Sequence, residues 1–211
     1  GMESVPALFD VDGDGDDDLV VSNKIDPDDL TTSVLHVFEN LTDRLSIEAT
    51  RFIEGHKDQP FFMYLSFYTV HNPQQGKPEL VEKYEKKAAA LGYRDEDRFA
   101  PVTPGSKIAS RRLQDHPVYA AMVQTMDENV GRVLDKLDAL GLSDDTIVIF
   151  TSDNGGLSTT EGRPTSNEPL RAGKGWHYEG GIREPFFIRW PGVTKPGDAC
   201  DVPVVSTDLY P

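Results

Sequence analysis

One segment sets narrow limits on the fold: an apolar, β-branched run that stops at a carboxylate, an amide and two glycines. It reads Thr-Ile-Val-Ile-Phe-Thr-Ser-Asp-Asn-Gly-Gly (146–156). The run has the length and composition of a buried strand, and its last four residues are also good turn chemistry. In an open α/β sheet, ligands bind beyond the carboxyl ends of the strands. Asp153 and Asn154 are therefore candidate oxygen ligands for a calcium- or magnesium-type cation.

A long amphipathic helix is expected immediately before this strand, over residues 116–140. Its apolar residues recur at the three- and four-residue spacing of a core-facing stripe. The predicted stripe consists of Tyr119, Met122, Val123, Met126, Val130, Val133, Leu134 and Leu137. Asp115 can cap the start of this helix, and Gly141 can cap its end.

The remaining elements extend the alternation of helices and apolar strands. Helices are expected at 42–56, with Thr42 as N-cap, and at 77–91; strands are expected at 61–67 and 184–190. The stretches 92–114 and 156–172 are expected to be irregular loops. This alternation predicts a mainly parallel sheet flanked by helices, an α/β fold.

The charge distribution divides the chain near residue 40. The 211 residues carry a net charge of −15, which argues against nucleic acid or an anionic membrane as a partner. Residues 1–40 contain eleven acidic residues and one lysine, whereas residues 41–211 are closer to balance. We therefore expect two parts, 1–40 and 41–211. No run of 18 apolar residues occurs, so no membrane span is expected.

The first part contains an Asp-rich loop, Asp-Val-Asp-Gly-Asp-Gly-Asp-Asp-Asp (10–18). Positions 1, 3, 5 and 9 of a calcium loop are held by Asp10, Asp12, Asp14 and Asp18. Gly15 is at the sharp-turn position, but position 12 is Val21, so the loop is not an EF-hand. Short strands are expected at 5–9, 18–22 and 34–38. The segment 5–40 resembles one FG-GAP repeat of the integrin type, which implies a short β-hairpin that binds calcium; the alternative is a disordered acidic arm.

Two further segments have distinctive sequences. Pro-Phe-Phe-Met-Tyr-Leu-Ser-Phe-Tyr-Thr-Val-His-Asn-Pro (60–73) is a buried-type strand that leads to His71. A glycine-studded loop within 170–192 carries Lys174 and precedes the last strand. Together with 146–156, these segments resemble the sulfatase family of the alkaline-phosphatase superfamily. The resemblance covers about residues 41–211 and implies the C-terminal part of a sulfatase catalytic domain, a partial α/β sandwich.

The resemblance implies a role for each candidate residue. Asp153 and Asn154 match the pair that completes the family's divalent-cation site, usually calcium. His71 matches the histidine that protonates the leaving alcohol oxygen, and Lys174 matches a lysine that binds sulfate oxygens. A cation and a lysine would concentrate positive charge where the transferring sulfuryl group is negative. The four side chains are therefore expected to converge within about 10–12 Å, the scale of a small-ligand cleft.

The family's nucleophile motif is absent from the sequence. Family members use a cysteine in Cys-x-Pro-Ser-Arg, which is converted to formylglycine, whereas Cys200 lies in Asp-Ala-Cys-Asp-Val-Pro. The single cysteine also excludes an internal disulfide. We therefore expect a sulfuric ester hydrolase by family, inactive as this chain alone, whose ligand is a sulfated carbohydrate or aryl sulfate.

Two other functions remain open on the sequence. The chain could be a non-catalytic, calcium-binding interaction module with a sulfatase remnant, or a phosphate-ester hydrolase of the same superfamily. The family implies a periplasmic or extracellular location, although no signal peptide is recognisable and Gly1-Met2 is interpreted as a tag remnant. The oligomeric state cannot be inferred from the sequence.

Overall fold

The computed structural model describes residues 7–9, 18–20 and 33–209, and the chain divides into two compact units at Val37 and Phe38. In the first unit, β1 (Ala7–Phe9) pairs antiparallel with β2 (Asp18–Val20), as two of the three predicted strands require. The third predicted strand, 34–38, is wrong because these residues are helical. The loop 10–17 and the side chain of Asp18 lie outside the described part, so the FG-GAP resemblance stays a prediction.

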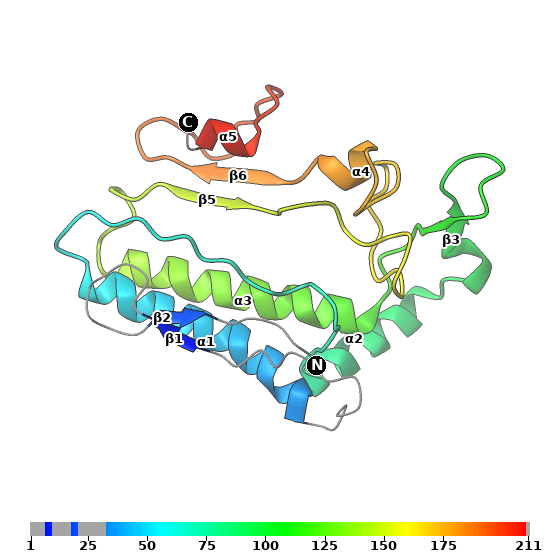
Figure 1. Cartoon of the computed structure of the whole chain (residues 1–211), viewed down its shortest axis with the longest axis horizontal. Coiled ribbons are helices and arrows are strands. Elements are labelled where there is room, and N and C mark those ends of the chain that lie inside the picture. Colours follow the sequence, from blue (N-terminus) through cyan, green and yellow to red (C-terminus); the bar gives the residue numbers. More distant parts are fainter. Residues whose placement is uncertain (1–6, 10–17, 21–32, 210–211) are drawn as a thin grey trace. The chain divides into compact units, whose positions relative to one another are not determined.

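The first long helix, α1 (Ser33–Gly55), begins earlier than the sequence indicates. Thr42 is therefore not an N-cap but a buried residue inside the helix, and its hydroxyl lies 2.5 Å from that of Thr69. Ala49 and Ile53 on α1 pack with Val133 and Leu137 on α3 (Pro117–Ala139) to form the buried core. This helix pair is the rigid base of the second unit (Figure 1).

The start of α3 is capped by the residue after the predicted one, and its end is where the sequence predicts it. His116 is the N-cap, and its Nδ1 accepts a hydrogen bond from the Tyr119 amide at 3.2 Å, whereas Asp115 pairs with Arg98 and Arg111 instead. Pro117 follows at the first helical position, where its missing N–H costs no hydrogen bond. Gly141 has φ 71° just beyond the helix, so its predicted role at the C-terminus is confirmed.

The buried face of α3 is more polar than the predicted stripe. Met122, Val133 and Leu137 are buried as expected, but Val123 is exposed while Thr125 and Asn129 are buried. The amide of the buried Asn129 is hydrogen-bonded both to α1 and to the preceding turn of α3. Its Nδ2 donates to Asp43 Oδ1 and to the Thr125 carbonyl, both at 2.8 Å, and its Oδ1 accepts from Ser46.

Asp43 extends this polar contact to the next helix. Lys77, the N-cap residue of α2 (Pro78–Leu91), places its ammonium 3.0 Å from Asp43 Oδ2. Burial raises the pKa of Asp43, but hydrogen bonds from Asn129 and Lys77 and the charges of Lys77 and Arg132 outweigh it and hold the pKa below its usual range. The three long helices are thus joined through one carboxylate as well as through apolar packing.

The predicted irregular stretch 92–114 contains a small hairpin. Following the 3-10 turn η1 (Asp95–Asp97), β3 (Phe99–Pro101) pairs antiparallel with β4 (Ala109–Arg111). The guanidinium of Arg111 is buried and lies 5.1 Å from the centre of the Phe99 ring.

The predicted parallel sheet is not formed by the described residues. The strands β5 (Val148–Thr151) and β6 (Phe186–Arg189) pair antiparallel, with Thr151 opposite Phe186. A parallel neighbour needs a crossover helix that returns the chain to the starting end of the sheet. Between β5 and β6 the chain has only the four-residue α4 (Glu179–Ile182). The predicted strand 61–67 is extended along α3 but belongs to no sheet (Figure 1).

The chain continues past β6 to a short final helix, α5 (Ser206–Leu209). Within the described ranges, no helix has both the length and the apolar character needed to cross a membrane.

The packing predicts a large difference between two isoleucines of α1. Ile53 is fully buried, whereas Ile47 is 40% exposed. We expect Ile53→Ala to lower the free energy of unfolding by about 2–5 kcal/mol, because it leaves a cavity in the core. The matched Ile47→Ala should cost less than about 1 kcal/mol. Urea denaturation of the full chain measures both; equal losses would contradict the assigned core.

Candidate functional site

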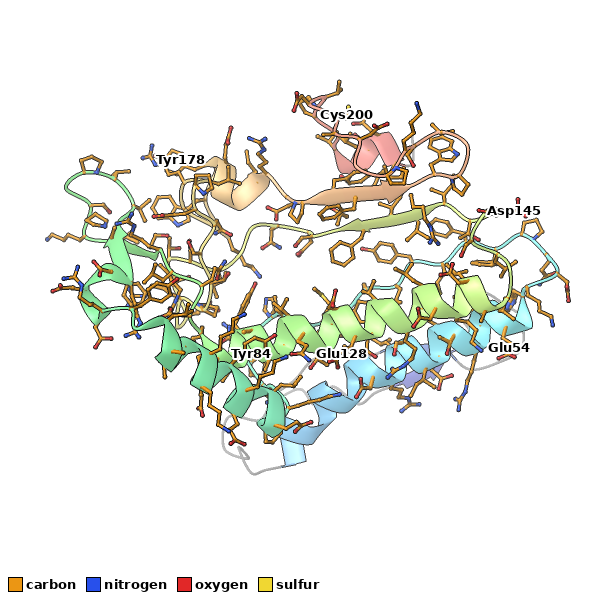
Figure 2. The ribbon with its side chains drawn as sticks, turned by 180° about the vertical axis from the view of Figure 1, so that it is seen from behind. Glu54, Tyr84, Glu128, Asp145, Tyr178 and Cys200 are labelled. Carbon is orange, nitrogen blue, oxygen red and sulfur yellow. The ribbon has the colours of Figure 1, made fainter. Side chains whose placement is uncertain are left out.

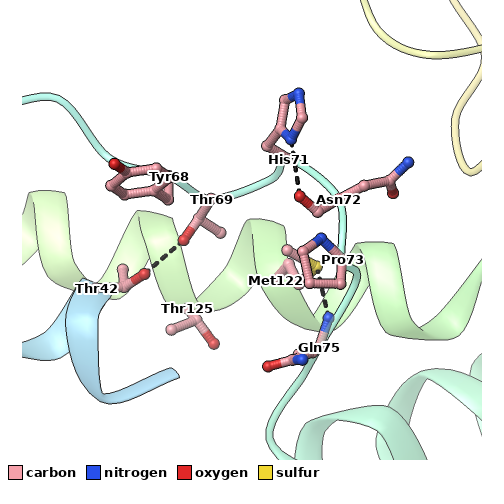
Figure 3. Close-up of a pocket in the computed structure, with 9 residues that line it drawn as sticks. All are labelled: Thr42, Tyr68, Thr69, His71, Asn72, Pro73, Gln75, Met122 and Thr125. Carbon is pink, nitrogen blue, oxygen red and sulfur yellow. Dashed lines mark hydrogen bonds between the residues drawn. The ribbon is translucent and has the colours of Figure 1, made fainter. Parts of the chain in front are cut away.

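The extended segment 60–73 ends in a bend that presents His71. The His71 amide donates to the Tyr68 carbonyl at 2.8 Å, and the Thr42–Thr69 hydroxyl contact anchors the start of the bend to α1. On the other side, the Gln75 amide lies 3.3 Å from the Met122 sulfur on α3 (Figure 3). The imidazole is held above the helices and is exposed.

Hydrogen bonds define the state of the His71 ring. Its Nδ1 lies 2.8 Å from the Asn72 carbonyl oxygen. Because a carbonyl can only accept, Nδ1 carries the proton and Nε2 has the lone pair. The Lys174 ammonium lies 2.8 Å from Nε2 and donates to it. Two predicted site residues that are 103 positions apart in sequence are therefore in direct contact.

Lys174 is also linked to the Asp153–Asn154 turn. Its backbone amide donates to the Gly156 carbonyl at 3.1 Å. The Gly155 amide donates to the Gly181 carbonyl at 3.2 Å, so both glycines of the turn bond to the segment that carries Lys174. The turn after β5 and the Lys174 loop are thus neighbours, whereas the predicted 10–12 Å convergence of all four side chains stays a prediction.

Glycines make this close approach possible. A Cβ on Gly155 would collide with the backbone of Gly180, and one on Gly173 would collide with the Gly156 carbonyl. Gly180 and Gly181 are similarly crowded by backbone atoms of the Lys174 loop. We call these five residues the glycine junction: Gly155, Gly156, Gly173, Gly180 and Gly181. Backbones approach this closely only where side chains are absent.

Asn167 fastens the same junction and was not identified from the sequence. Its Nδ2 donates to the Gly156 and Ala172 carbonyls at 2.8 and 2.9 Å, and its Oδ1 accepts from the Gly156 amide at 3.1 Å. No pattern in the polar loop 156–172 distinguishes Asn167 from its neighbours. Its role depends on which backbones it lies between, so only the tertiary structure reveals it.

Asn72 is a second positioning residue that the sequence did not single out. Its carbonyl accepts from the His71 ring, and its Nδ2 donates to Glu161 Oε2 at 3.0 Å. This contact ties the His71 bend to the long polar loop between β5 and Lys174. The only sequence signal was its position next to His71.

The carboxylate of Glu184, two residues before β6, lies close enough to the predicted metal ligand Asp153 to feel its charge. Burial raises the pKa of Glu184, and the negative charge of Asp153 raises it further. Glu184 Oε1 is buried without a hydrogen-bond partner among the described residues. Glu184 lies here because β6 runs antiparallel to β5, so its start meets the end of β5. Glu184 was not identified from the sequence, because the predicted parallel sheet would not bring the start of one strand to the end of its neighbour.

These oxygens do not amount to a complete cation site. Asp153 is exposed and Asn154 is half-buried, and calcium takes six to eight oxygen ligands. Among the residues with described side chains, no group of three or more His, Cys, Asp or Glu residues could hold a metal ion. The residues present therefore do not fit a bound calcium by themselves, although their chemistry is that of a partial oxygen shell.

Other candidate features lie apart from the His71–Lys174 contact. A cavity of about 20 Å³ beneath the His71 bend holds no more than a water molecule, so it is not a substrate cleft (Figure 3). His177 is exposed in the Lys174 loop. Cys200 is free and exposed, and it lies beside α5, apart from Tyr178 (Figure 2).

The glycine junction predicts opposite effects for two glycine substitutions. Gly155→Ala should lower the Tm and shift the amide NMR signals of 172–175, because the new methyl group displaces the Lys174 loop. The matched control is Gly131→Ala on α3, where a Cβ meets nothing within 4 Å. It should stabilise the protein by about 0.5–1 kcal/mol, since alanine is the better helix former. An unchanged Tm in Gly155→Ala would contradict the junction.

Comparisons with known proteins point to one family. The sulfatase family model, described as "Sulfatase", matches residues 11–211. The chain is 32% identical to human steryl-sulfatase over 179 residues, which is 82% of this chain and 26% of that protein. It is 35% identical to a sulfatase from Formosa agariphila over 184 residues, which is 82% of this chain and 29% of that protein.

A solved structure gives the same result. The crystal structure of Ps i-CgsB in complex with k-i-k-neocarrahexaose matches with a TM-score of 0.53 and 33% sequence identity, covering 72% of this chain and 28% of that one. This chain therefore spans less than a third of the length of the relatives that it matches. The predicted family is confirmed: the chain belongs to the sulfatase family.

Proposed function

We propose that this chain supplies the sulfate-binding and proton-donating part of a sulfuric ester hydrolase. The observation that carries the proposal is the 2.8 Å contact between Lys174 Nζ and His71 Nε2, next to the turn that holds Asp153 and Asn154. A lysine and a histidine that point at one another from distant loops form a small basic site. Family membership makes a sulfate ester the expected anion.

The two side chains have complementary roles in this proposal. Without ligand, Lys174 Nζ donates to His71 Nε2, and it has two further N–H groups with which it can bind an anion. An ester sulfate placed between them would accept the Lys174 hydrogen bond, and its negative charge would favour a protonated Nε2. His71 would then donate that proton to the ester oxygen as the sulfur–oxygen bond breaks, so that the alcohol leaves neutral.

The attacking nucleophile has to come from outside the residues identified here. No Cys-x-Pro-Ser-Arg motif is present, and the free Cys200 lies beside α5. The chain on its own is therefore proposed to bind the ester without turning it over. Lys174 would still bind the sulfate and His71 would still protonate the ester oxygen, but no nucleophile would accept the sulfuryl group.

The substrate class is proposed as a sulfated carbohydrate or an aryl sulfate. One relative is a steryl-sulfatase and one matched structure contains k-i-k-neocarrahexaose, so the names span two chemically different alcohols. What they share is the ester sulfate that Lys174 would bind. A periplasmic or extracellular location is part of the same proposal.

Binding of an aryl sulfate tests the role of Lys174. We expect 4-nitrophenyl sulfate to perturb the His71 and Lys174 NMR signals of the full chain. Lys174→Ala should raise the Kd by about 10- to 150-fold, the loss of a hydrogen bond to a charged group. Lys195→Ala, at an exposed lysine elsewhere, is the matched control. Equal affinity in Lys174→Ala and wild type would contradict the site, and tighter binding of 4-nitrophenyl phosphate would favour the phosphate-ester alternative.

Turnover tests the missing nucleophile. Incubated with 4-nitrophenyl sulfate and calcium, the full chain should release no more 4-nitrophenol than the His71→Ala, Lys174→Ala double variant does. Binding and electrostatics without an acceptor leave only the slow reaction with water. Release that is fast in the wild-type chain and lost in the double variant would show that the chain contains its own nucleophile.

Calcium binding is proposed at the Asp-rich loop rather than at Asp153. One continuous loop offers Asp10, Asp12, Asp14 and Asp18, so closing it around an ion costs little chain entropy. By contrast, Asp153 and Asn154 supply only part of a calcium ligand shell, and their acidic neighbour, Glu184, is partly buried.

Calorimetric calcium titration distinguishes binding at the Asp-rich loop from binding at Asp153. Asp12→Ala combined with Asp14→Ala should abolish the strongest calcium binding of the full chain, whereas Asp153→Ala should leave it within about twofold, because the continuous loop supplies more carboxylates. If Asp153→Ala removes the strongest binding and the loop variant retains it, the calcium has been assigned to the wrong end of the chain.

A further inference from the structure

A larger cavity, of about 360 Å³, lies where the start of α3 meets α2 and the β3–β4 hairpin. This volume is within the range of small-molecule sites, whereas the cavity beneath the His71 bend holds only a water molecule. Both α2 and β3 lie at the end of the second unit where α3 begins (Figure 1). The polar lining of the larger cavity consists of Glu85, Arg98, Arg111, Asp115 and His116.

Arg111 is buried at this cavity, and only part of its guanidinium is used by the protein. Its side chain is 8% exposed. Its Nε donates to the Arg163 carbonyl at 2.5 Å, and its Nη1 donates to the Asp115 carboxylate. Among the residues that the structure describes, none accepts a hydrogen bond from Nη2. Because a buried donor is costly to leave unpaired, an acceptor bound in the cavity would be favourable.

The buried charges at the cavity are unequal in number. The carboxylate of Asp115 is 2% exposed and is shared by two guanidinium groups, since Arg98 Nε lies 2.5 Å from its Oδ2 while Arg111 contacts its Oδ1. Arg163 adds a third guanidinium, whose carbon lies 4.3 Å from the centre of the Phe99 ring. One buried carboxylate therefore faces several cations.

The pKa of Arg111 reflects the same imbalance. Burial lowers this pKa, and the charges of Arg98 and Arg163 lower it further; Asp115 raises it but does not outweigh them. A guanidinium nevertheless stays protonated in a protein. Glu85, which also lines the cavity, is exposed, so water screens its charge. The positive charge of Arg111 is thus incompletely balanced within the protein.

His116 contributes a further donor. Its Nδ1 accepts from the Tyr119 amide, so the proton of the neutral ring is on Nε2. Burial lowers the pKa of His116, and the charge of Arg111 lowers it further, which favours this neutral form. The N-terminal end of α3, which carries the positive end of the helix dipole, starts at the same place.

We propose that the cavity at the start of α3 binds a small oxyanion, such as a sulfate or carboxylate group, between Arg98, Arg111 and His116. Guanidinium groups bind oxyanions through charge-assisted and often paired hydrogen bonds. The cavity shares no lining residue with the His71–Lys174 contact, so this inference does not depend on the proposed function.

An NMR titration tests whether the cavity binds an anion. The full chain carrying His71→Ala and Lys174→Ala is titrated with sodium sulfate and, separately, with sodium acetate, while sodium chloride keeps the ionic strength constant. The Arg111 Nε and His116 ring signals should move and saturate with at least one of the two anions. Stronger binding of sulfate would identify a tetrahedral ligand, and stronger binding of acetate would identify a carboxylate. No saturable shift with either anion would overturn the proposal.

Loss of one guanidinium tests the assigned donors. Arg98→Gln should raise the Kd of the bound anion by about 10- to 150-fold, the effect of losing a hydrogen bond to a charged group. The matched control is Arg112→Gln, because Arg112 is exposed, pairs with Glu168 and does not line the cavity. It should change the Kd by less than about twofold, as expected for a screened surface charge. Equal losses in the two variants would show nonspecific attraction and overturn the site.

A gain of affinity cannot result from misfolding and completes the test. Glu85→Gln removes the exposed acid that lines the cavity, so it should lower the Kd by about 1.5- to 5-fold, the size of a surface charge interaction. Glu79→Gln removes the same charge from an exposed position of α2 that does not line the cavity, and it should leave the Kd unchanged. If Glu85→Gln binds the anion no more tightly than Glu79→Gln does, the anion is not in this cavity and the proposal is wrong.

Discussion

The close approach of backbones at the glycine junction is the constraint on which the site depends. The turn that carries Asp153 and Asn154 contacts the Lys174 loop through Gly155 and Gly156, where no Cβ is tolerated. Asn167 then bonds both segments at once. Because the Lys174 amide donates to the Gly156 carbonyl, the lysine has a defined starting point from which to reach His71. A bulkier residue at Gly155 would separate the two loops before any side chain chemistry could occur.

The helix layer holds the other half of the contact. His71 lies on a bend that is anchored to α1 through Thr42 and Thr69, and α1 is joined to α3 through the buried Ser46–Asn129 contact and the Ile53 core. The site is therefore assembled from a rigid helical base and a loop region that is held by backbone hydrogen bonds. The extended segment 60–67 leads from the end of α1 to this bend.

Much of the fold was predictable where the pattern is local. The helix at 116–140, the strand at 146–151 and the cap at Gly141 follow from apolar spacing and turn chemistry, and the structure agrees within a few residues. The described residues do not form the predicted parallel sheet, because strand direction depends on partners and crossovers, which no local pattern encodes. The strand expected at 34–38 was wrong because a β-branched apolar run of that length also fits the first turns of a longer helix.

The sequence by itself determined the family and four candidate residues: His71, Lys174, Asp153 and Asn154. It could do so because the motifs typical of the family, and the side chains that carry the chemistry, lie within short segments. Only the tertiary structure decided that Lys174 meets His71 across 103 positions, that Glu184 approaches Asp153, and that Asn167 and Asn72 hold the loops. These relations depend on which backbones pack together and in which direction. That information arises from long-range packing, and polar loop residues show no periodicity that would reveal it.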